Sequence, residues 1–99
     1  MKEISLDQIN QWIQEQRVFQ LIDVRTAGER AQYQIGGENI PFDELMQRKS
    51  EINTDRPVIL YCEKGIRSLL IIQRLEALGY SNLYNLKHGI KPYAEKLLK

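Results

Sequence analysis

Apolar side chains recur at helical spacing in four segments of the chain, and each segment predicts an amphipathic helix. Ser5 and Gln8 form a capping box, so the first of these helices begins at about Leu6. Thr26 and Glu29 form a second capping box, which predicts an additional short helix after them. The four segments with helical spacing are residues 6–15, 42–49, 67–78 and 90–98.

Three short segments between the helices predict β-strands, and they are residues 20–24, 57–62 and 82–86. The first two are almost continuously apolar, as expected of strands in a parallel sheet that is covered on both faces. The third alternates polar and apolar residues and predicts a shorter or more exposed strand. Helices that alternate with strands predict an α/β fold with right-handed crossovers, in which ligands bind beyond the carboxyl ends of the strands.

Composition limits the class of protein. The chain has 99 residues, of which 42% are hydrophobic and 27% are charged, so we expect one globular domain over residues 1–99. A formal charge of +1 argues against a nucleic-acid partner. The absence of a long apolar run or a secretory signal predicts no membrane partner and a cytoplasmic location. A lone cysteine in that reducing compartment is free to act as a thiolate.

The segment after the second apolar strand carries the candidate chemistry. Cys62 ends that strand, and a turn containing Gly65 leads into the most apolar predicted helix. Backbone N–H groups in such a turn, together with the helix N-terminus, form an anion-binding site. Lys64 and Arg67 add positive charge, so the surroundings favour the thiolate of Cys62 and a nucleophilic role over a buried structural one.

The segment from Cys62 to Ser68 reads Cys-Glu-Lys-Gly-Ile-Arg-Ser, and it resembles the active-site loop of the rhodanese family of sulfurtransferases. Residues 21–25 are similar to the family's Asp-Val-Arg strand end, and residues 35–41 are similar to its Gly-to-Asn-Ile-Pro segment. The chain departs from many members at residues 33–35, where Tyr-Gln-Ile replaces Gly-His-Ile. The resemblance implies a three-layer α/β fold, with a mostly parallel sheet of four to five strands flanked by helices.

The resemblance also implies sulfur transfer in two displacements. Cys62 would attack the outer sulfur of a donor such as thiosulfate, expel sulfite and become a persulfide, from which a thiol or cyanide removes the sulfur. The acceptor thiol could belong to a protein, and no metal or organic cofactor is expected. The residues expected to bind substrate are Glu63, Lys64, Gly65, Ile66 and Arg67, and those expected to support the loop are Asp23, Arg25 and Ser68.

Two of these side chains have alternative roles. Arg67 binds an anionic donor or, instead, pairs with a carboxylate such as Asp23 and braces the loop. Glu63 is either an exposed loop residue or a negative charge that disfavours dianionic thiosulfate.

Other functions stay open. The chain could be a non-catalytic or sulfur-carrying rhodanese module that binds a protein partner. A cysteine phosphatase would have five residues between its cysteine and its arginine, whereas Arg67 is only five positions after Cys62, so this loop is one residue short. With one cysteine and one histidine, a closed zinc site is not expected.

Overall fold

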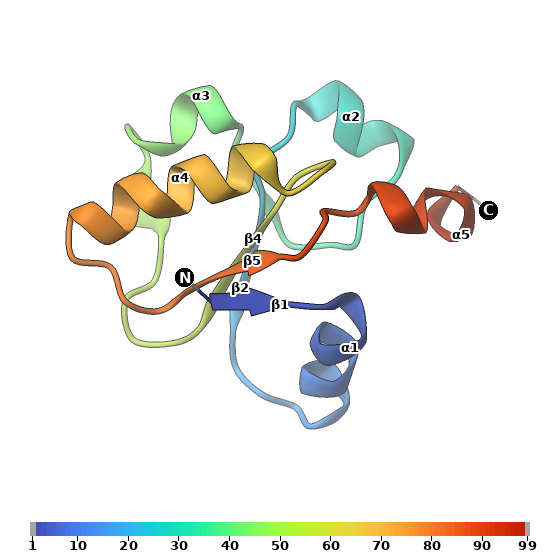
Figure 1. Ribbon diagram of the computed structural model, residues 1–99, viewed down its shortest axis with the longest axis horizontal. Helices are drawn as coiled ribbons and strands as arrows, with labels where there is room; N and C mark the ends of the chain where they lie inside the picture. Colours follow the sequence, from blue (N-terminus) through green and yellow to red (C-terminus); the bar gives the residue numbers. More distant parts are fainter. Residues whose placement is uncertain (1, 99) are drawn as a thin grey trace.

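The structure of the protein, a computed structural model that describes residues 2–98, contains one five-stranded parallel sheet with the strand order β1-β5-β4-β2-β3 (Figure 1). The strands are β1 (Lys2–Ile4), β2 (Gln20–Asp23), β3 (Glu38–Asn39), β4 (Val58–Tyr61) and β5 (Leu83–Leu86). The α-helices are α1 (Leu6–Gln14), α2 (Ala27–Gln32), α3 (Phe42–Leu45), α4 (Ile66–Ala77) and α5 (Ala94–Leu97). Two 3₁₀ helices are η1 (Lys49–Glu51) and η2 (Lys91–Tyr93).

Helices cover both faces of the sheet, which confirms the expected three-layer α/β fold (Figure 1). The side chains of β4 alternate between the two layers of core and are fully buried. Val58 and Leu60 pack with residues of α3 and α4, and Ile59 and Tyr61 pack with residues of α1 and α5. β4 is therefore packed on both faces, and this packing fixes the position at which the following loop begins.

Both predicted capping boxes are present, and each starts the helix expected of it. The Ser5 hydroxyl accepts from the Gln8 N–H at the start of α1, and the Thr26 hydroxyl accepts from the Glu29 N–H at the start of α2. These contacts lie within one helical turn, so neighbouring residues of the sequence are enough to predict them.

Several elements differ from the sequence prediction. The strands β1 and β3 were not predicted, because two or three residues carry no recognisable alternation. β5 is not an exposed strand, because it lies between β1 and β4, and Leu83 and Leu86 pack into the cores on the two faces of the sheet. The segment 42–49 forms only the short α3 followed by η1, and the last segment begins as the 3₁₀ helix η2 before α5.

None of the helices in residues 2–98 has the length and apolar content that a membrane span requires.

Candidate active site

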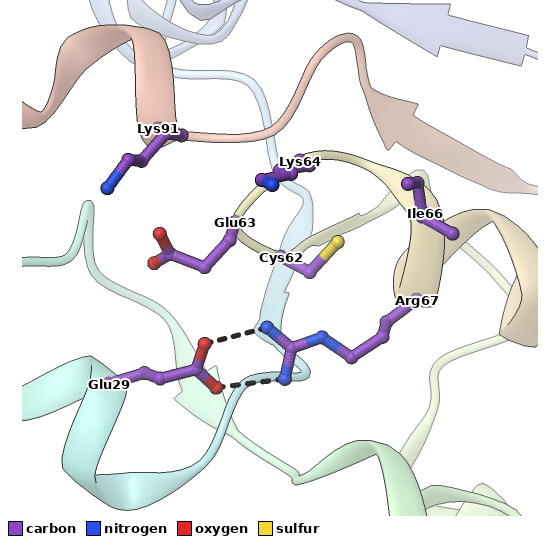
Figure 2. A pocket seen from close by; sticks show the side chains of 7 residues that line it. All are labelled: Glu29, Cys62, Glu63, Lys64, Ile66, Arg67 and Lys91. Atoms are coloured by element: carbon purple, nitrogen blue, oxygen red, sulfur yellow. Dashed lines mark hydrogen bonds and ion pairs between the residues drawn. The ribbon is translucent and has the colours of Figure 1, made fainter.

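Cys62 directly follows β4 and lies at the base of a pocket of about 400 Å³ beyond the carboxyl end of that strand. The residue is only 1% exposed. Figure 2 shows its side chain inside the loop that leads to α4. The pocket is lined by Glu29, Cys62, Glu63, Lys64, Ile66, Arg67 and Lys91, so the structure brings the thiol together with four of the residues expected to bind substrate.

The loop folds back over the sulfur of Cys62 because Gly65 has φ +85°. This left-handed conformation favours glycine, and it lets the Gly65 N–H point at Cys62 Sγ at 3.1 Å. The N–H of Ser68 lies 3.5 Å from Sγ, and the Ser68 hydroxyl lies 3.3 Å from it. Two backbone N–H groups, of Gly65 and Ser68, therefore face the sulfur at the N-terminus of the 12-residue α4, where negative charge is stabilised.

The segment after β5 holds the start of this loop in place. The N–H of Ile90 donates to the Cys62 carbonyl at 3.0 Å, and the N–H of Lys91 donates to the Glu63 carbonyl at 2.9 Å. Gly89 packs so closely that a β-carbon there would clash with the backbone of Glu63, and its φ is +68°. Position 89 thus needs glycine, while the preceding His88 adopts φ +65° with an exposed side chain.

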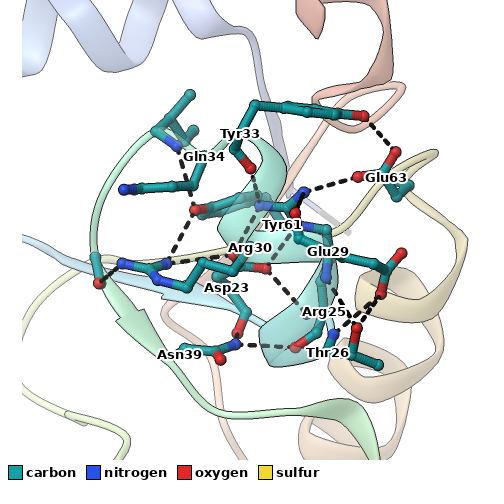
Figure 3. A network of polar contacts seen from close by, with 12 residues as sticks. Asp23, Arg25, Thr26, Glu29, Arg30, Tyr33, Gln34, Asn39, Tyr61 and Glu63 are labelled. Atoms are coloured by element: carbon teal, nitrogen blue, oxygen red, sulfur yellow. Dashed lines mark hydrogen bonds and ion pairs between the residues drawn. The ribbon is translucent and has the colours of Figure 1, made fainter. Parts of the chain in front are cut away.

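A buried arginine anchors the loop from the other side of the site (Figure 3). Arg25 has no exposed surface and binds Asp23 through two hydrogen bonds, of 3.0 and 2.9 Å. Its Nη1 also donates to Glu63 at 2.7 Å, so the ion pair at the end of β2 reaches the loop through Glu63. Glu63 is therefore not simply an exposed loop residue, because its side chain is only 20% exposed.

Tyr33 supplies a second contact to Glu63. Its hydroxyl donates to Glu63 Oε2, and its main-chain carbonyl accepts from Arg25. Burial, followed by the hydrogen bond to the Glu63 carboxylate, raises the pKa of Tyr33 to about 12. Tyr33 consequently stays protonated and keeps donating at neutral pH.

Arg67 pairs with Glu29 and not with Asp23, which corrects the partner suggested from the sequence. The guanidinium donates to both oxygens of Glu29, at 2.8 and 2.7 Å (Figure 2). Asp23 is unavailable to Arg67 because Arg25 and Arg30 already bind it. The Glu29–Arg67 bridge ties α2 to the first turn of α4.

Protonation of Glu29 should break this bridge. The hydrogen bond from Arg67 lowers the pKa of Glu29 to about 2, against the opposing effect of burial. Because the pKa is lower in the folded than in the unfolded chain, the bridge contributes stability fully above about pH 4.5 and loses that contribution as the pH falls towards 2. We expect Glu29→Gln to lower stability at pH 7 by about 1 kcal/mol, or about 4 °C in the thermal midpoint.

Thermal unfolding of both proteins at a series of pH values tests this expectation. The difference between them should shrink as the pH falls through the acidic range. Glu3→Gln, which removes an exposed carboxylate on β1, is the control and should show no such trend. A difference between wild type and Glu29→Gln that stays constant down to the lowest pH would contradict the assignment.

Two lysines provide the remaining positive charge of the pocket. Lys64 and Lys91 are exposed, and no ion pair holds either of them within residues 2–98. In the view of Figure 2 both lie on the opposite side of Cys62 from the Glu29–Arg67 bridge. In the described part of the chain, His, Cys, Asp and Glu side chains do not gather in groups of three that could bind a metal ion.

Sequence reasoning missed four side chains of this site. Glu29 was assigned only to the helix cap, where its carboxylate does accept from the Thr26 N–H. Lys91 lies in the predicted last helix, far from Cys62 in sequence. Tyr33 had no visible partner in the sequence. Asn85, which lies next to Ser68, was visible only as one of the polar residues of an alternating strand.

Comparison with known proteins decides the family. The model of the Rhodanese-like domain family matches residues 5–96 of the chain. The protein belongs to this family. A relative described as a sulfurtransferase of Allochromatium vinosum is 34% identical over 95 residues, which are 95% of this chain and 89% of that protein. The uncharacterised protein YqhL of Bacillus subtilis is 45% identical over 82 residues, which are 82% of this chain but only 65% of YqhL.

Solved structures of rhodanese-like proteins share the fold. A rhodanese-like domain protein from Staphylococcus aureus superposes with a TM-score of 0.83 at 30% identity, covering 91% of this chain and 88% of that one. The human single domain sulfurtransferase TSTD1 superposes with a TM-score of 0.77 at 25% identity, covering 97% of each chain. The family resemblance seen in the sequence is therefore confirmed, and sulfur transfer is the activity named for several of the relatives.

Proposed function

We propose that the protein moves a sulfane sulfur from thiosulfate, or a similar donor, to a thiol or cyanide through a persulfide on Cys62. The observation that carries this proposal is the position of Cys62 Sγ at the base of the pocket, with the Gly65 N–H 3.1 Å away and the N-terminus of α4 beside it. A nucleophilic sulfur needs this kind of electropositive surrounding beside a pocket.

The reaction consists of two displacements. Cys62 first loses its proton to solvent, and the thiolate attacks the outer sulfur of thiosulfate. A new S–S bond forms, the bond to the inner sulfur breaks, and sulfite leaves with the bonding electron pair. In the second step an acceptor thiolate or cyanide attacks the outer sulfur of the persulfide, and the Cys62 thiolate leaves with the electron pair. No metal or organic cofactor takes part in either step.

Backbone N–H groups of the loop suit the persulfide that this reaction creates. Within residues 2–98, the N–H groups of Glu63, Lys64, Ile66 and Arg67 donate to no protein acceptor. They belong to residues that line the pocket, so they are available to an anionic outer sulfur. Preorganised donors of this kind stabilise developing negative charge without reorganisation.

The position of Arg67 argues against phosphatase activity. A cysteine phosphatase uses the two-pronged guanidinium of its loop arginine to hold a phosphoryl group. Here both prongs are occupied by Glu29, and the loop is one residue shorter than that chemistry uses. Hydrolysis of a phosphate ester that depends on Cys62 would revive the alternative.

A second candidate is a carrier role, in which Cys62 passes its sulfur to one protein and turns over small acceptors slowly. The putative sulfur carrier protein YrkF of Bacillus subtilis is 26% identical over 95 residues, and this chain spans 51% of it. Thiocyanate formation from thiosulfate and cyanide separates the two candidates. Steady turnover supports the enzyme, whereas formation of a persulfide without turnover supports the carrier.

We expect Lys64 and Lys91 to attract the anionic donor, because they are the pocket cations that carboxylates do not neutralise. Removing both in the variant Lys64→Ala/Lys91→Ala should raise KM for thiosulfate about fivefold, with little change in kcat. The wild-type rate at low thiosulfate should also fall as salt is added. Lys49→Ala, on η1 and outside the pocket, is the matched control. An unchanged KM in the double variant would show that the lysines do not bind the donor.

A further inference from the structure

A buried row of three polar side chains runs from the thiol of Cys62 into the sheet. Cys62 Sγ lies 3.3 Å from Ser68 Oγ, which lies 2.5 Å from Asn85 Oδ1 on β5. Ser68 has no exposed surface, and Asn85 is 3% exposed. The Ser68 hydroxyl has one proton, so it can donate to the sulfur or to Asn85 but not to both.

The surroundings of Asn85 decide which way its amide faces. Its Nδ2 lies 3.2 Å from the Gly65 carbonyl, and that carbonyl can only accept a hydrogen bond. The amide nitrogen must therefore face Gly65, and the amide oxygen must face Ser68. Because a carbonyl oxygen and a hydroxyl oxygen approach this closely only with a proton between them, the Ser68 proton is directed at Asn85. The contact between Cys62 and Ser68 then requires the thiol to be the donor.

We propose that Asn85 is a positioning residue that holds Cys62 as a neutral thiol by taking the Ser68 proton away from the sulfur. In the resting state the thiol donates to Ser68, and Ser68 donates to Asn85. When the sulfur loses its proton, the Ser68 hydroxyl turns towards it and Asn85 Oδ1 loses its donor. Asn85 thus disfavours the ionised sulfur, and Ser68 stabilises it only after turning.

The charged groups around the sulfur do not belong to this row. Those that line the pocket are Glu29 on α2, Glu63 and Lys64 on the loop, Arg67 on α4, and Lys91 on η2. None of them contacts Asn85 through a hydrogen bond or ion pair among the described residues, so a substitution at Asn85 leaves them in place. The inference rests on Cys62 being the reactive group of the proposed function, but it concerns ionisation of the thiol and needs no sulfur donor.

Alkylation of Cys62 by iodoacetamide tests the inference, because this neutral reagent reacts with the thiolate. In Asn85→Ala the Ser68 hydroxyl is free to donate to the sulfur, so alkylation at about pH 6 should be about fivefold faster than in wild type. The ratio of the two rates should fall as the pH is raised. In the Ser68→Ala background the same substitution at Asn85 should have no effect.

Two further variants separate this role from a structural one. Asn85→Asp keeps an acceptor for Ser68, so its alkylation at about pH 6 should not exceed that of wild type. Asn82→Ala removes an asparagine whose amide donates to two backbone carbonyls far from Cys62, and it should leave the alkylation profile unchanged. If Asn85→Ala cannot be folded, Asn85→Leu replaces it. An unchanged or slower rate in Asn85→Ala, or the same acceleration without the Ser68 hydroxyl, would overturn the proposal.

Discussion

Replacing Cys62 with serine is expected to reduce sulfur transfer by at least about 10³-fold, the largest effect of any substitution in the chain. A serine hydroxyl does not ionise at neutral pH, and it is a far weaker nucleophile than a thiolate. No histidine lines the pocket to act as a general base for this hydroxyl, because the lining residues are Cys62, Ile66 and side chains of Glu, Lys and Arg. Thiocyanate formation from thiosulfate and cyanide measures the loss.

The fold of the Cys62→Ser variant should survive. The new hydroxyl takes the place of a sulfur that already receives the N–H of Gly65 and touches Ser68, so its polar atom has partners. Its thermal midpoint should therefore lie within a few degrees of wild type, about 1 kcal/mol in stability. Transfer activity in a folded Cys62→Ser protein above a few per cent of wild type would contradict the assignment of Cys62 as the nucleophile.

Replacing Arg25 with methionine is expected to have the largest effect on stability. Arg25 is fully buried between Asp23 and Glu63, and its loss leaves the buried carboxylate of Asp23 with the partly exposed Arg30 as its cation and the N–H of residue 25 as a neutral donor. Breaking a buried ion pair from one side costs about 3–5 kcal/mol. The free energy of unfolding of a domain of this size is about 5–15 kcal/mol, so this loss is a large part of it. The thermal midpoint should therefore fall by at least about 12 °C.

Arg48 offers a matched control for this prediction. It also contacts two carboxylates, Glu44 and Glu51, but its side chain is 37% exposed. Arg48→Met should therefore lower stability far less than Arg25→Met does. Urea unfolding of both variants compares them directly. Equal, small losses for Arg25→Met and Arg48→Met would contradict the account of Arg25 as the anchor of the site.

The elements predicted correctly from the sequence depend on short-range signals. Ser5 and Thr26 start their helices through contacts within one turn, and the apolar run of β4 is typical of a strand buried on both faces. The strands β1 and β3 were missed because they depend on pairing with β5 and β2, which lie elsewhere in the sequence. Their residues carry no local pattern that distinguishes them from loops.

The residues of the candidate site also differ in whether neighbouring residues or distant contacts determine their roles. The loop from Cys62 to Ser68 is continuous in sequence, so its chemistry could be predicted from neighbouring residues. The partner of Arg67 could not, because the choice between Asp23 and Glu29 depends on Arg25 occupying Asp23 in the folded chain. Asn85 reaches the site only because β5 lies beside β4 in the sheet.

The mass of the intact protein tests the central claim most directly. The reduced protein is incubated with thiosulfate, and its intact mass is measured by mass spectrometry before and after cyanide is added. The Cys62→Ser variant is treated in the same way. The account predicts a gain of one sulfur atom that cyanide removes and that the variant never shows. A folded wild-type protein with a free thiol that gains no sulfur from thiosulfate, or a variant that gains it equally, would contradict transfer from thiosulfate through Cys62.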